Sequence, residues 1–160
     1  LMSDITAEIG SDALRFIFLT KKSDTHLEFD IDMLKNQDSS NPIFYINYAH
    51  ARINQLFVKS GLSLDDIVNE SFENLNSDAL NLVYESLLLE SVLNEAFVKR
   101  DMQKITEYLY NLASSIHKFY NEHKIVGSNK EKVYLKVLSI AKLSLKVGLK
   151  LLGIEAKEIM

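Results

Sequence analysis

The chain has 160 residues, of which 25% are charged, a formal net charge of −4 and no cysteine. This length fits one domain, or one domain with part of another, and a hydrophobic content of 47% supplies a real core and argues against disorder. The absence of cysteine excludes disulfides, zinc knuckles and thiol catalysis. Five glycines and one proline favour helices over a turn-rich β architecture.

The hydropathy pattern and the first residues indicate the cellular location of the protein and whether the chain is part of a longer one. Apolar runs, such as Leu87–Leu89, are short and interrupted by charge, so we expect no transmembrane span. No secretory or transit segment is visible, and we expect a cytoplasmic protein. Because a native chain does not normally begin with leucine, we interpret Leu1–Asp4 as internal sequence of a longer protein.

Two short helices are predicted at the start of the chain. Ser3 can cap the first, which ends at Gly10, and Ser11 can cap the second, which extends to about Leu19. Their polar caps and apolar interiors favour helices that pack against a core.

The next segment predicts a strand and a domain boundary. Polar and apolar residues alternate over 26–31, which is typical of a short half-buried strand. Polar residues 36–41 then form a loop. We therefore divide the chain into an α/β segment over 1–40 and a helical domain over 41–160.

The first long helix of that domain carries unusually rich polar chemistry. Asn41 is a good N-cap, and Pro42 suits the first helical turn. Tyr45, Tyr48 and Arg52 are three and four residues apart, so they lie along one face. Aromatic rings beside a guanidinium are the groups that stack on unpaired bases and contact phosphate.

Helical spacing of apolar residues continues to the end of the chain. It predicts helices over 42–60, 64–70, 78–100 with a possible break near Leu89, 101–123 and 130–152. The last of these has an apolar seam with alternating spacings of four and three: Tyr134, Leu138, Ala141, Leu145, Gly148 and Leu152. Helices joined by short loops predict an all-α fold, an antiparallel helical bundle.

Charge is distributed unevenly along the chain. Residues 1–98 carry six Lys/Arg against sixteen Asp/Glu, whereas residues 99–160 carry twelve against six. Five lysines of the last helix fall within an arc of roughly 120°: Lys132, Lys136, Lys142, Lys146 and Lys150. Such a face could follow a phosphate backbone, although outward helix faces are often lysine-rich for solubility alone.

Common catalytic and metal-binding patterns are absent from the sequence. Glu28, Asp30 and Asp32 alternate, but the glycine and final glutamate of an EF-hand are missing. His117 and His123 are six residues apart and do not share a helix face, which argues against a metal pair. No glycine-rich phosphate loop occurs.

Four separated segments resemble one family, in its order. Residues 41–52 closely resemble the NPxxYxxYAHAR helix that opens the anticodon-binding domain of arginyl-tRNA synthetases. Residues 10–16 with 24–30 resemble the family's G-x-DALRF and S-H-L-D-F-D segments, and residues 112–121 its L-A-x-x-x-H-x-FYN segment. The C-terminus is similar to the family's LLG-x-x-x-PE-x-M ending, with Lys157 in place of the usual proline.

This resemblance implies the C-terminal part of an arginyl-tRNA synthetase, with the end of the catalytic region in 1–40 and the DALR anticodon-binding domain in 41–160. The parent enzyme would attach arginine to its tRNA using ATP and magnesium. The HIGH and KMSKS motifs of the ATP site are absent here, so we expect this chain to be non-catalytic and without a cofactor. The implied partners are arginine tRNA and the enzyme's own catalytic domain, in a monomer without membrane or DNA contacts.

The expected tRNA contacts come from three segments of the chain. The aromatic residues and Arg52 would hold unstacked anticodon bases, Lys118 would attract phosphate, and the family's C-terminal tail lies near the anticodon site. The predicted tRNA-binding residues are Tyr45, Tyr48, His50, Arg52, Lys118, Tyr120 and Met160. Two alternatives are the anticodon-binding domain of another synthetase, such as the cysteinyl enzyme or the glycyl β subunit, and a helical interaction module that never touches RNA.

Overall fold

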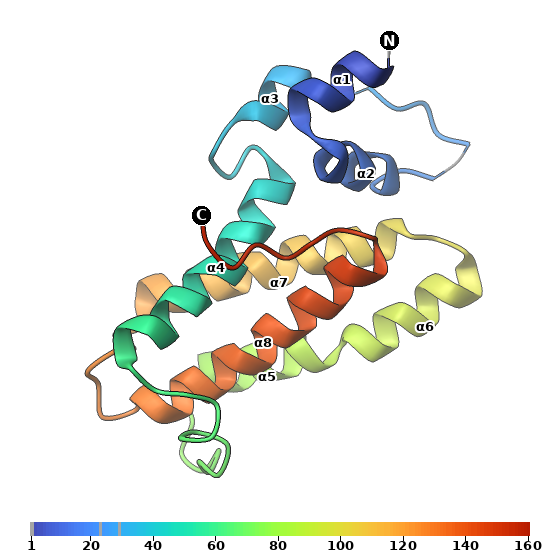
Figure 1. Cartoon of the computed structure of the whole chain (residues 1–160). Coiled ribbons are helices and arrows are strands. Elements are labelled where there is room, and N and C mark those ends of the chain that lie inside the picture. Colours follow the sequence, from blue (N-terminus) through green and yellow to red (C-terminus); the bar gives the residue numbers. More distant parts are fainter. Residues whose placement is uncertain (1, 23, 29) are drawn as a thin grey trace.

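The computed structural model describes residues 2–22, 24–28 and 30–160, and this part of the chain contains helices and no strand (Figure 1). The all-α class is therefore confirmed for the described residues. The eight helices found there are α1 (Met2–Ile9), α2 (Ser11–Leu19), α3 (Ile31–Lys35), α4 (Pro42–Ser60), α5 (Ser77–Leu87), α6 (Leu89–Lys99), α7 (Gln103–Glu122) and α8 (Glu131–Leu151).

The strand predicted over 26–31 is wrong for the described part of that range, and Phe29 lies outside it. The reason is a helix cap. The Asp30 carboxylate accepts hydrogen bonds from the backbone N–H groups of Asp32 and Met33, at 2.9 and 3.4 Å, and so begins α3. Capping by an aspartate outweighs a short polar–apolar alternation when no neighbouring strand is available for pairing.

The start predicted for α4 is confirmed. The Asn41 side-chain oxygen accepts from the backbone N–H of Phe44 at 3.3 Å, and Pro42 occupies the first turn. The same amide donates through Nδ2 to the carbonyl oxygens of Leu34 and Asn36, at 2.7 and 3.0 Å. One buried asparagine therefore caps α4 and fixes the preceding loop against it.

The helix predicted over 64–70 is wrong, because the segment forms only turns. The Leu64 carbonyl oxygen accepts from the backbone N–H groups of Ile67 and Val68 in a single helical turn, and Ile67 is buried in the core. Lys136 Nζ donates to the carbonyl oxygens of Val68 and Glu70, at 2.7 and 2.6 Å. These carbonyls are therefore satisfied without further helix, and a helix this short has little stability of its own.

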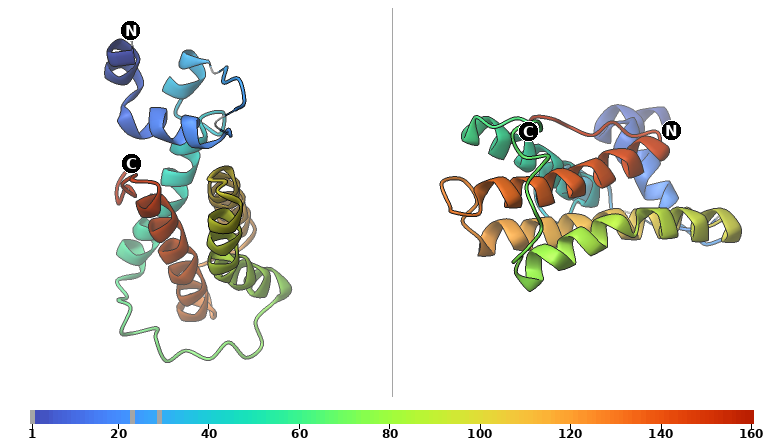
Figure 2. Two further views of the ribbon diagram at one scale, coloured as in Figure 1. Left: turned by 90° about the vertical axis from the view of Figure 1, so that its right-hand side faces the viewer. Right: turned by 90° about the horizontal axis from the view of Figure 1, so that it is seen from below.

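Helices α4, α5, α7 and α8 pack around one apolar core, and α6 packs on α7. Figures 1 and 2 show α7 and α8 side by side, running in opposite directions. Gly148 allows their close approach, since a Cβ atom at this position would lie 2.6 Å from Cδ2 of Leu109. A larger residue at 148 would push α8 away from α7.

Helices α1–α3 form a separate group at the N-terminal end of α4, and α2 contacts both α4 and α7 (Figure 1). The chain after α8 returns across α4 as an extended tail. Arg15 of α2 donates to the carbonyl oxygen of Gly153 at the start of this tail. None of the helices in the described residues combines the length and the apolar character needed to cross a membrane.

Candidate nucleic-acid interface

Aromatic rings and one guanidinium gather where α4 meets the C-terminal half of α7. Cζ of Arg52 lies 4.5 Å from the centroid of the Tyr48 ring and 4.2 Å from the centroid of the Tyr120 ring. Its Nη2 also donates to the Tyr48 hydroxyl at 2.9 Å. The guanidinium is thus held by cation–π contacts to two rings, one from each helix.

A buried histidine fixes the orientation of this guanidinium. His117 Nε2 lies 3.1 Å from the Tyr45 carbonyl oxygen, and His117 Nδ1 lies 3.2 Å from Nη1 of Arg52. Because a carbonyl oxygen only accepts, Nε2 carries the proton and Nδ1 accepts from the arginine. Burial and the positive charge of Arg52 lower the pKa of His117, which favours the neutral ring that this arrangement requires.

Ring contacts extend the cluster in both directions. The His117 ring centroid lies 4.3 Å from that of Tyr45 and 5.5 Å from that of Tyr48. Tyr45 also contacts Tyr110 at 5.3 Å, and Phe44 stacks on Tyr48 at 5.9 Å. These neighbours hold the rings in place, so that they are ordered before any ligand arrives.

A hollow of about 340 Å³ opens beside the cluster. Tyr45, Tyr48 and Arg52 line one side, the loop at residues 37–39 lines another, and Asn121 of α7 completes the wall. The volume lies at the lower end of the range for small-ligand sites, about 300–1,000 Å³. Aromatic faces, a guanidinium and an amide are the groups that bind a splayed base.

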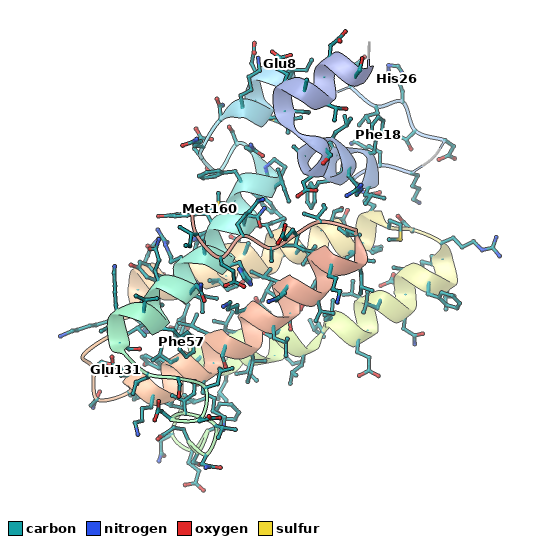
Figure 3. All side chains as sticks on the ribbon, viewed as in Figure 1. Glu8, Phe18, His26, Phe57, Glu131 and Met160 are labelled. Atoms are coloured by element: carbon teal, nitrogen blue, oxygen red, sulfur yellow. The ribbon has the colours of Figure 1, made fainter. Side chains whose placement is uncertain are left out.

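Three of the predicted residues, His50, Met160 and Lys118, lie outside this cluster. His50 is 0% exposed, and its Nδ1 lies 2.8 Å from the carbonyl oxygen of Lys157 in the tail. The expectation that His50 contacts a base needs correction, because this position has no access to solvent. Met160 is 43% exposed at the end of the tail, which Figure 3 shows beside α4.

Lys118 is exposed on another face of α7. It lines a depression together with the acidic residues Asp78, Glu85 and Glu122. A turn of about 200° around the helix separates it from Tyr120. The structure therefore brings Tyr45, Tyr48, Arg52 and Tyr120 together and leaves Lys118 outside their cluster.

The lysine-rich face of α8 is largely engaged by the chain itself. Lys136 bonds to two carbonyls of the 64–70 segment, and Lys132 pairs with Glu70 at 3.8 Å. Lys142 and Lys146 pair with Glu158 of the tail, at 3.1 and 3.4 Å. These contacts favour a structural role for four of the five lysines over phosphate binding.

Sequence reasoning missed His117 and Tyr110 as members of the site, although it noted that Asn121 beside Tyr120 could hydrogen-bond a splayed base. The signal was present, because positions 110, 117, 120 and 121 follow the seven-, three- and four-residue spacing of one helix face. The face of α7 that contains Tyr120 also contains Tyr110, His117 and Asn121.

The fold and the cluster together define an all-helical bundle domain that presents aromatic rings and a guanidinium on its surface. Residues 46–160 match the family described as the DALR anticodon binding domain. The chain belongs to this family, as the four motifs indicated.

Two proteins to which the chain is similar have the same name. The chain is 84% identical over 160 residues to a protein of Aliarcobacter butzleri (strain RM4018) and 58% identical to one of Campylobacter lari (strain RM2100), both called arginine–tRNA ligase. It spans 30% of the length of each. The match therefore covers the whole chain and less than a third of these relatives.

Solved structures agree with this assignment. A structure described as an arginyl tRNA synthetase from Campylobacter jejuni superposes with a TM-score of 0.97 at 57% identity, covering 100% of this chain and 36% of that one. Thermus thermophilus arginyl-tRNA synthetase gives a TM-score of 0.79 at 22% identity over 96% of this chain and 27% of that one. The second likeness shows the fold alone.

Proposed function

We propose that this chain is the anticodon-binding, C-terminal part of an arginine–tRNA ligase and that it binds arginine tRNA. Residues 41–160 act as an antiparallel anticodon-binding bundle, and residues 1–40 belong to the end of the catalytic region. The whole enzyme would use ATP and magnesium to attach arginine to tRNA. It would work in the cytoplasm as a monomer, with its own catalytic domain as the partner of this part.

The observation that carries this proposal is the guanidinium of Arg52, held between the rings of Tyr48 and Tyr120 beside an open hollow. An arginine kept in place by two rings and a neutral histidine needs little reordering on binding, which lowers the entropic cost of capturing a flexible RNA loop. Its remaining donors can reach a phosphate or the edge of a base.

The residues of the cluster have different roles in this proposal. Tyr48, Arg52 and Tyr120 contact RNA, while Tyr45 and His117 hold them in position. Lys118 lies outside the hollow and contributes longer-range attraction for phosphate. Met160 contacts RNA from the end of the tail.

A filter-binding comparison tests the proposal, with arginine tRNA set against an unrelated tRNA. We expect tighter binding to arginine tRNA, and a loss of about five- to 150-fold on Arg52→Ala or Tyr48→Ala, because each base stacked on an aromatic ring contributes about 1–3 kcal/mol. Lys59→Ala is the matched control, since Lys59 is an exposed cation at the far end of the same helix.

Several results would contradict this function. Equal affinity for the two tRNAs would favour a different synthetase, and no affinity for either would favour a helical interaction module. If Arg52→Ala and Lys59→Ala had equal effects, RNA binding would depend on general charge and not on the cluster. Circular dichroism of each variant confirms that the helices remain folded.

A further inference from the structure

The tail that follows α8 begins with a defined helix end. Gly153 has a φ of 71°, the left-handed conformation that glycine adopts at low cost. Its N–H donates to the Lys150 carbonyl at 2.9 Å, and the N–H of Ile154 donates to the Leu149 carbonyl at 2.9 Å. This is the Schellman pattern, and with Ile154 buried it sets the direction in which the tail leaves the helix.

Within the core, His50 holds the backbone of this tail. The carbonyl oxygen of Lys157 can only accept, so Nδ1 of His50 carries the proton and donates to it at 2.8 Å. The other ring nitrogen, Nε2, is buried and has no hydrogen-bond partner in the described part of the chain. Both nitrogens are therefore closed to an external ligand while the tail is in place.

Two asparagines on the same flank of α4 complete the contact. The N–H of Lys157 donates to Asn47 Oδ1 at 3.0 Å, and Asn54 Nδ2 donates to the Glu158 carbonyl oxygen at 3.2 Å. Asn47, His50 and Asn54 are three and four residues apart, so they face the tail together. We call these three residues the tail clamp.

Charge adds to the clamp from α8. Lys142 Nζ lies 2.6 Å from Asn54 Oδ1 and 3.1 Å from the Glu158 carboxylate, and Lys146 lies 3.4 Å from the same carboxylate. Partly exposed ion pairs of this kind stabilise little. The bonds from the clamp to the tail backbone are the more important part, because His50 and Asn47 are buried.

Beyond the clamp, the chain ends in two apolar residues that it does not bury. Ile159 is 84% exposed and Met160 is 43% exposed. A backbone fixed up to Glu158 holds this apolar end in a defined position next to α4, the helix that carries Tyr48 and Arg52. Exposed apolar side chains at a fixed position can pack on an unstacked base.

We propose that His50 is a positioning residue, which fixes the C-terminal tail on α4 so that Ile159 and Met160 are presented to RNA, and which makes no RNA contact itself. This inference rests on the proposed function, since it assigns part of the RNA contact to the tail. It also explains why a histidine inside the core belongs to a helix that binds RNA.

The first experiment measures the clamp without RNA. Hydrogen exchange at the Lys157 amide is followed by NMR in the full chain, in His50→Leu, which loses the donor, and in His50→Asn, whose amide nitrogen can occupy a place near that of Nδ1. We expect exchange to accelerate about tenfold in His50→Leu and to stay close to that of the unaltered chain in His50→Asn. The Nδ1-protonated tautomer of His50, read from its ring nitrogen shifts, is the matching signature. Unchanged exchange in His50→Leu would overturn the clamp.

The second experiment connects the clamp to RNA. The affinity for arginine tRNA is measured for His50→Leu, for a chain that ends at Ala156, and for the two changes combined. We expect similar losses from either change and no further loss from their combination. The truncated chain keeps Ile154 and removes only exposed residues, so we expect its helices to remain folded.

Three other results would each contradict part of the proposal. A further loss from His50→Leu in the truncated chain would show that His50 acts on RNA other than through the tail. Unchanged affinity of the truncated chain would show that the tail end makes no RNA contact, while the proposed function would stand. If the unaltered chain bound no tRNA, both proposals would be overturned, and hydrogen exchange would still report on the clamp.

Discussion

Two flanks of α4 carry polar side chains, and they serve opposite purposes. One flank holds Tyr48 and Arg52, which are half-exposed beside a hollow. The other holds the tail clamp, which the tail covers. The comparison shows that polar residues on one helix can divide into an exposed surface, which we propose binds RNA, and a surface that binds the protein's own chain.

The two buried histidines repeat this division. His117 accepts from Arg52 through Nδ1, whereas His50 donates to the Lys157 carbonyl through Nδ1. Burial lowers the pKa of both histidines and so favours their neutral forms, and the two hydrogen bonds require opposite tautomers. The same residue type thus orients the arginine that we propose binds RNA at one site and anchors the tail at the other.

The largest effect that separates the flanks is on stability. We expect His50→Ala to lower the free energy of unfolding by about 2–4 kcal/mol, because it leaves a cavity in the core and removes the hydrogen bond to the tail. Arg52→Ala, at a half-exposed position, should cost about 1 kcal/mol or less. Urea unfolding of both variants measures the difference. Equal losses would mean that the cluster flank is as structural as the clamp flank.

Arg52→Lys sharpens the description of the cluster flank. Lysine keeps the charge and loses the planar fork, so we expect binding of arginine tRNA to weaken by about 1–2 kcal/mol. The dependence of affinity on salt should be retained in Arg52→Lys and should decrease by about one counterion in Arg52→Ala. Titrations at several salt concentrations measure both quantities. If Arg52→Lys bound normally, only the charge would matter.

Both His50 and His117 should contribute to the pH dependence of stability. Burial lowers the pKa values of His50 and His117 below the ordinary 6.5, with positive charges of Lys142 and Arg52 adding to the effect. Below pH 6.5 the unfolded chain therefore binds more protons, and stability is full above this pH and is lost as the pH falls. The slope is at most about 1.4 kcal/mol per pH unit for each histidine.

Variants assign this slope to the two sites. We expect His50→Leu and His117→Gln each to remove one part of it, measured by urea unfolding between pH 7.5 and pH 5. A slope that is unchanged in both variants would mean that neither histidine is kept neutral by folding.

The smallest effect on stability is expected for the ion pair between Lys146 and Glu158, which lies beside the tail clamp. Lys146→Ala removes a pair with Glu158 in which the lysine side chain is 56% exposed, so stability should change by about 0.5 kcal/mol or less. Thermal unfolding in low and high salt measures this change. A larger loss would show that charge, and not hydrogen bonds to the backbone, holds the tail.

Local signals predicted much of the fold. Asn41, Pro42 and Gly61 defined α4 at both ends, because caps act within one turn. The all-α class followed from apolar spacing. The errors at 26–31 and 64–70 arose where a side chain satisfied backbone groups in another way. At 26–31 this was the carboxylate of Asp30, and at 64–70 it was the ammonium group of Lys136, far away in the sequence.

The site was predicted less completely, since its contacts join residues far apart in the chain. Tyr48 and Arg52 could be paired from helical spacing alone, four residues apart. The bond from His50 to Lys157 joins residues 107 positions apart, and that from Arg52 to His117 joins residues 65 positions apart. Spacing within a helix contains no information about such pairs, so the sequence did not predict that His50 is buried against the tail.

The tail contact through Asn47 also bears on how positions can change together. The N–H of Lys157 donates to Asn47 Oδ1, and proline, the residue expected at position 157 from the resemblance, has no N–H to give. A chain with proline at position 157 would leave this buried oxygen without its donor. Positions 47 and 157 should therefore be exchanged as a pair when such tails are transplanted between relatives.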